Sequence, residues 1–114
     1  MKFIITIDTE EDNWDKYSRT DNPVENLKKI IPLQKIFDCY NVKPTYLISY
    51  PVATDPGCIE ILKPILDQGR CEIGTHCHPW NTPPFDEEIN EHNKTIKVLY
   101  ENNSINSITS NIFY

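Results

Sequence analysis

Three runs of β-branched and aromatic residues alternate along this chain with segments of helical periodicity. The runs cover Lys2–Asp8, Val42–Tyr50 and Arg70–Gly74, and the first is almost unbroken in apolar residues from Phe3 to Ile7. An unbroken apolar run is typical of a strand that is buried on both faces, as in a parallel sheet. Strands that alternate with helices indicate parallel strands joined by crossover helices. The sequence therefore predicts an α/β fold with the element order β-α-β-α-β-α.

Segments with helical signals separate and follow these runs. Three helices are expected, over residues 24–41, 58–69 and 87–102. Asn22 and Pro23 mark the start of the first helix, and Pro32 should kink or split it. Gly69 is the expected stop of the second helix, and Asp86 is the expected N-terminal cap of the third. The remaining stretches, 9–22, 51–57 and 75–85, are predicted to be loops or turns.

The chain has 114 residues, which corresponds to one domain at most and is short for an α/β enzyme. Its composition, 39% hydrophobic and 25% charged, is that of a globular protein and not of a disordered one. No internal repeat or low-complexity linker divides it, so residues 1–114 are treated as one unit. Residues 104–114 resemble the beginning of a fourth strand. The pattern is therefore typical of the first half of a larger α/β domain.

The formal net charge is −6, and the lysines and arginines are scattered along the chain. This argues against binding driven by nucleic-acid phosphate or by an acidic membrane surface, whereas a cation would be attracted. No apolar run approaches the length of a membrane span, and the first residues lack the long apolar segment of an export signal. A cytoplasmic protein is expected. The four cysteines form no C-x-x-C pair, so free thiols in a reducing compartment are expected.

Two pairs of polar side chains follow the first and third predicted strands. Asp8 and Glu10 form one pair, and His76 and His78 form the other. Extended residues at i and i+2 point to the same side, and parallel strands present their C-terminal ends at one edge of the sheet. Two imidazoles and a carboxylate are the ligand set of a catalytic zinc, iron, cobalt or manganese site that keeps positions open for water. The second carboxylate can then act as a base toward that water.

Each of these residues also has a structural interpretation. A histidine pair of the form HxH is weak evidence by itself, and the acids that begin at Asp8 can be a solvated loop. The alternation of side chains points Cys77 away from the histidines, as a packed thiol. Trp80 can be a core anchor or the wall of a sugar site, and Trp14 in the acidic loop is equally ambiguous. His92 is interpreted as part of a solvated helix face.

Two motifs at these positions resemble a known family. The segment TIDTEED, residues 6–12, resembles the T-F-D-D-G motif of the polysaccharide deacetylases of the NodB-homology type, also called carbohydrate esterase family four. The segment EIGTHCHPW, residues 72–80, resembles the second motif of that family, E-I-G-x-H-(S/T)-x-x-H. GTHCHPWNTPP, residues 74–84, matches throughout the pattern G-x-H-x-H-P-W-x-x-P-P of a subgroup that includes proteins of lipopolysaccharide biosynthesis.

The resemblance implies a distorted (β/α) barrel and metal-dependent hydrolysis of an N- or O-acetyl group on a sugar or polysaccharide. Zinc is the metal expected first, with cobalt, nickel or manganese as alternatives. Asp8 falls at the position of the catalytic base, Glu10 at that of the metal carboxylate, and His76 at that of the first metal histidine. His78 stands for the second histidine, at i+2 where the common motif has i+4. Trp80 is the candidate substrate-binding residue.

The resemblance covers most of this chain but about the first half of the family domain. The later arginine and histidine of the family have no counterpart here, so a truncated barrel without its general acid is expected. Two alternatives stay open: a non-catalytic metal-binding remnant, and a related hydrolase of non-sugar C–N bonds. A half barrel also leaves a strand edge unpaired, which favours self-association.

Overall fold

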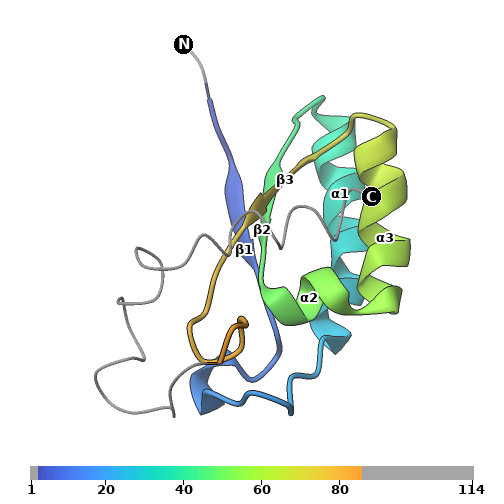
Figure 1. Ribbon diagram of the computed structural model, residues 1–114. Coiled ribbons are helices and arrows are strands. Elements are labelled where there is room, and N and C mark those ends of the chain that lie inside the picture. Colours follow the sequence, from blue (N-terminus) through green and yellow to red (C-terminus); the bar gives the residue numbers. More distant parts are fainter. Residues whose placement is uncertain (1–2, 86–114) are drawn as a thin grey trace.

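The computed structural model of the protein describes residues 3–85 (Figure 1). Within them, three strands form one parallel sheet in the order β1-β2-β3. The strands are β1 (Thr6–Thr9), β2 (Thr45–Ile48) and β3 (Glu72–Thr75). The predicted α/β class and the parallel arrangement are therefore confirmed for this part of the chain. The predicted helix over 87–102, the strand start at 104–114 and His92 lie outside the described residues.

Helices occupy the segments between the strands. They are η1 (Trp14–Lys16), η2 (Glu25–Lys29), α1 (Ile30–Cys39), α2 (Tyr50–Thr54) and α3 (Pro56–Asp67). Figure 1 shows α1 and α3 side by side on one face of the sheet. No helix within residues 3–85 is long and apolar enough to cross a membrane.

The core lies between the sheet and these helices. Tyr46 and Ile48 of β2 point into it, with 0% and 3% of their surfaces exposed. The Tyr46 hydroxyl donates a hydrogen bond of 2.8 Å to Gln34 of α1, so its polar end is satisfied inside the core. Alternation along the strands places the intervening residues on the opposite face. There Asp8, Leu47 and Gly74 are neighbours across the three strands.

The first strand is shorter than predicted. Phe3 and Ile4 precede it and are 78% and 79% exposed, so the expectation of a strand buried from Phe3 onward is wrong. Pairing with β2 begins where the amide of Thr45 donates to the carbonyl of Ile5. β1 and β3 form the two edges of the described sheet. Self-association through an edge stays a prediction.

The helix predicted over 24–41 is split, as Pro32 indicated. A 3-10 segment, η2, precedes α1, and Pro32 lies in the first turn of α1, where a missing N–H costs no hydrogen bond. The predicted start at Asn22 is wrong, because the first turn begins at Glu25. The carboxylate of Asp12 accepts hydrogen bonds from the amides of Glu25 and Asn26 and so caps this turn from a distant loop.

The stretch 51–57, predicted as a loop or turn, contributes to two helices. Pro51 lies in the first turn of α2, a position that tolerates proline. α3 begins at Pro56, two residues earlier than predicted, because Asp55 caps it by accepting a 2.9 Å hydrogen bond from the amide of Cys58. Gly69 lies just beyond the end of α3 with a φ of +70°, in agreement with its predicted role as the stop.

Candidate metal centre

The polar residues that follow β1 and β3 meet at one edge of the sheet. The Oε2 atom of Glu10 lies 3.0 Å from Nε2 of His78 and 3.3 Å from Nε2 of His76. One ligand atom from each of these residues lies within 4.8 Å of the others. The structure thus brings together the carboxylate and the two imidazoles that the sequence nominated, and this group can hold a metal ion.

The backbone after β3 explains why both imidazoles face Glu10. The amide of His76 donates 2.8 Å to the carbonyl of Ile48, so the extended conformation continues past the end of β3. Residues 76 and 78 then point to one side, and their rings lie 4.6 Å apart. Cys77 points to the other side and packs against the hydrophobic core, as the alternation predicts.

Asp8 lies at the rim of this centre. Its Oδ1 atom is 3.8 Å from Nδ1 of His76, and its side chain is 59% exposed. It does not belong to the group of three ligands within residues 3–85. Asp8 is therefore a carboxylate beside the centre that is open to solvent and to a ligand.

Glu11 also belongs to this site, although its sequence context did not indicate it. Its side chain is fully buried, although it belongs to a run of acids that suggested a solvated loop. Its Oε1 atom accepts from Asn81 at 2.6 Å and lies 3.0 Å from Nδ1 of His78, and its Oε2 atom accepts from Ser49 at 2.8 Å. A buried carboxylate is tolerable only when such donors satisfy it. The only signal in the sequence is a second glutamate directly after the strand end, which does not distinguish a buried from a solvated group.

The hydrogen bonds to Glu11 keep it ionised. Burial would raise the pKa of its carboxyl group, but hydrogen bonds from His78, a backbone amide and Ser49 outweigh burial and lower the pKa to about 2. An ionised Glu11 accepts the proton on Nδ1 of His78. This fixes the ring with the Nε2 atom directed at Glu10.

His78 consequently lies between two carboxylates. A neutral imidazole has a single N–H and can donate to only one of them. If Nδ1 donates to Glu11, the short contact between Nε2 and Glu10 requires either a second proton or a cation. Ligand atoms about 2.1 Å from a tetrahedral zinc ion are about 3.4 Å apart, and the distances of 3.0 and 3.3 Å from Glu10 to the imidazoles are close to this. These two distances are therefore compatible with a divalent cation bound by Glu10 and the two histidines.

Trp80 is packed beneath this centre. It is 8% exposed, its ring stacks on His78 with centroids 4.4 Å apart, and the edge of Tyr17 meets it at 4.7 Å. Of the two interpretations that the sequence left open, these contacts favour the core anchor over the wall of a sugar site.

Comparison with protein families, with curated proteins and with solved structures finds no match to this chain. The chemistry of the centre is therefore inferred from its own residues and distances.

Proposed function

We propose that the chain carries the metal centre of a hydrolase that removes acetyl groups from an N- or O-acetylated sugar. The observation that carries this proposal is the position of His78 between the buried carboxylate of Glu11 and the partly exposed carboxylate of Glu10. Glu10, His76 and His78 are the proposed ligands. Zinc is the proposed ion, because two imidazoles and one carboxylate form a common catalytic zinc set, and cobalt, nickel or manganese are the alternatives.

A bound divalent metal would supply Lewis acidity, which polarises an acyl carbonyl and makes water more acidic. Asp8 is the proposed general base. Its carboxylate is 59% exposed and lies at the rim, so it can reach a water molecule that approaches the centre from solvent. Glu11 holds the orientation and the tautomer of His78 and does not contact the substrate, since its side chain is fully buried.

The acetylated sugar is proposed from the resemblance of residues 6–12 and 74–84 to the deacetylase motifs. On the same basis, the described three-strand sheet would be the first part of a distorted (β/α) barrel. The two carboxylates and two histidines at the strand ends support the proposal, because both motifs contribute side chains to one centre.

The test begins with metal content. Protein purified with zinc or cobalt should hold about one ion per chain, and Glu10→Gln and His76→Ala should each lose most of it. Glu60→Gln is the matched control, because Glu60 is an exposed residue of α3 and belongs to no candidate site. If the wild-type chain binds no divalent ion, or if Glu10→Gln retains it fully, the metal centre is wrong.

Acetate release from N-acetylglucosamine oligomers is the second measurement. Release that depends on the metal and on Asp8 supports the proposed hydrolase. Metal binding without acetate release contradicts it and supports the metal-binding remnant. Turnover of small cyclic amides in place of acetylated sugars would instead identify a related hydrolase of C–N bonds.

A further inference from the structure

The two tryptophans of the chain lie near the metal centre but differ in accessibility. Trp80 is 8% exposed, and one face of its ring is covered by His78. Trp14 belongs to η1 in the loop that follows β1, and it is 49% exposed. A sugar ring packs on an aromatic side chain only where a face of the ring is open. Trp14 meets this condition and Trp80 does not.

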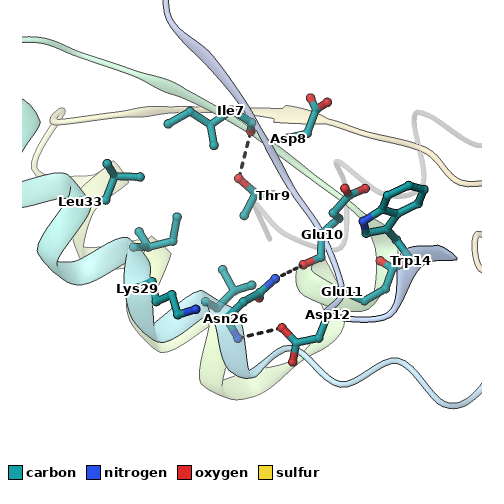
Figure 2. Close-up of a pocket in the computed structure, with 12 residues that line it drawn as sticks. Ile7, Asp8, Thr9, Glu10, Glu11, Asp12, Trp14, Asn26, Lys29 and Leu33 are labelled. Atoms are coloured by element: carbon teal, nitrogen blue, oxygen red, sulfur yellow. Dashed lines mark hydrogen bonds between the residues drawn. The ribbon is translucent and has the colours of Figure 1, made fainter. Parts of the chain in front are cut away.

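Trp14 also lines a cavity along the edge of β1 that has no partner strand within residues 3–85. The cavity has a volume of about 400 Å³, within the range of small-molecule sites. Figure 2 shows Trp14 and Glu10 at one end of it, while Lys29 and Leu33 of the helical layer line the opposite wall. Asp8, the proposed base, is also among its lining residues. The cavity therefore shares Glu10 with the candidate metal centre and Asp8 with its rim, whereas His76 and His78 do not line it.

The polar groups of the cavity limit what it can bind. Acidic side chains outnumber basic ones, since Asp8, Glu10, Glu11 and Asp12 line it together with Lys29. Asp12 is occupied by its hydrogen bonds to the amides of Glu25 and Asn26, and Glu11 is buried. Glu10 is a proposed metal ligand, so Asp8 is the acidic side chain that remains for a bound sugar. An exposed carboxylate accepts hydrogen bonds from hydroxyl and amide donors, which a sugar supplies.

We propose that Trp14 forms a substrate subsite that binds the pyranose ring of an N-acetylated sugar in this cavity. The proposal rests on the proposed function and deepens it. The indole supplies the apolar face for the ring, and the subsite leads an acetyl group of the sugar, or of its neighbour in an oligomer, toward Glu10 and the two histidines. Trp80 has a different role, because its ring stacks on the His78 imidazole and helps to hold it in place.

The test is calorimetric binding of an N-acetylglucosamine tetramer to the zinc-loaded chain of residues 1–114 and to its variants. Trp14→Ala should weaken binding about tenfold, which is what loss of an aromatic contact worth about 1.4 kcal/mol gives. Trp14→Tyr keeps a ring and should bind within about threefold of the wild type. Tyr40→Ala is the matched control, because Tyr40 is 77% exposed and does not line the cavity, and it should leave affinity unchanged.

Two results would overturn the subsite: a Trp14→Ala variant that binds the tetramer as the wild type does, or a Tyr40→Ala variant that is weakened equally. Zinc content measured on the same samples keeps this outcome separate from a failure of the proposed function. If Trp14→Ala holds zinc and binds the tetramer normally, the subsite is wrong and the metal centre stands. If the wild type holds no zinc but loses tetramer binding on Trp14→Ala, the metal centre is wrong and the sugar site stands.

Discussion

The imidazole of His78 lies 3.0 Å from the carboxylate of Glu11, which precedes it by 67 residues in the sequence. The contact joins Nδ1 of the ring to Oε1 of a fully buried side chain. Metal-binding histidines usually donate their second N–H to such a partner, which fixes the ring and makes the ligand nitrogen more basic. The relationship between these two residues is therefore what distinguishes this cluster from a chance meeting of acids and histidines at a surface.

Replacement of Glu11 should weaken metal binding although Glu11 is not a ligand. Glu11→Gln keeps the shape of the side chain but removes the charge that His78 faces, and metal affinity should fall about 10- to 100-fold. The absorption spectrum of the cobalt-loaded protein should also shift, because the orientation of the His78 ring changes. Competition with a chromophoric chelator measures the affinity, with Glu60→Gln as the control. Unchanged affinity and an unchanged cobalt spectrum would contradict this role of Glu11.

Asp8→Asn should separate catalysis from metal binding. Asp8 does not belong to the group of three ligands, so metal affinity should stay within about twofold of the wild type. Acetate release should fall about 10²- to 10⁴-fold, which is the usual contribution of a general base. Both are measured on one preparation. Loss of metal in this variant would show that Asp8 is a ligand and that the proposed division of roles is wrong.

Gly74→Ala should destabilise the fold. A Cβ atom at residue 74 would lie 2.6 Å from Cδ2 of Leu47, in the middle of the adjoining strand. The contact atom is the end of a partly buried side chain that can shift, so the cost should be about 1 kcal/mol in the free energy of unfolding, at the low end for overpacking and measurable by urea denaturation. Leu47→Val removes the clashing methyl group, so the double variant should be more stable than Gly74→Ala alone. If the double variant is less stable than Gly74→Ala alone, the contact with Leu47 is not the cause of the destabilisation.

Thiol labelling should find one reactive cysteine among the four. Cys39 is exposed, whereas Cys58 and Cys71 are buried and Cys77 is half-buried. Burial raises the pKa of the Cys58, Cys71 and Cys77 thiols, so little thiolate is present near pH 8. Ellman's reagent should therefore modify Cys39 quickly and the other three only on unfolding. Cys39→Ser should abolish the fast phase, and a fast phase that persists in this variant would contradict the assignment.

Stability should decline on the alkaline side. Burial and a hydrogen bond with the Asp55 carboxylate raise the pKa of Cys58 from 9.0 to about 12. Because folding raises this pKa, the folded protein holds the thiol proton more tightly than the unfolded chain does. The resulting contribution to the free energy of unfolding is complete below pH 9. It is lost as the pH rises toward 12, by up to about 1.4 kcal/mol per pH unit. Urea unfolding at several pH values between 8 and 11 measures this slope. Cys58→Ala should make it shallower, and an identical slope in this variant would exclude Cys58 as the source.

The sequence predicted the three strands and their parallel order because composition and alternation are local properties. Strand ends were less predictable. Phe3 and Ile4 are apolar and so resemble strand residues, but they lie outside the sheet because pairing with the neighbouring strand begins only at Thr45. The helix α2 was missed because Pro51 suggested a loop, although proline is tolerated in a first turn.

The candidate ligands were predictable because alternation and strand ends bring them together. Glu11 was not, because an acid in a charged run is usually solvated. Its burial depends on hydrogen bonds from Ser49 and Asn81, which belong to distant segments. Nothing in the sequence around these two residues indicates that they contact a carboxylate.

The hydrogen bonds of Glu11 also bear on the order of folding. They close loops of 38, 67 and 70 residues, to Ser49, His78 and Asn81. Contacts at such separation form late, because the entropy of closing long loops is lost before the contacts can compensate for it. We therefore expect the ligand geometry of His78 to be completed late in folding. A metal ion bound there would mainly slow unfolding and would have little effect on the rate of folding.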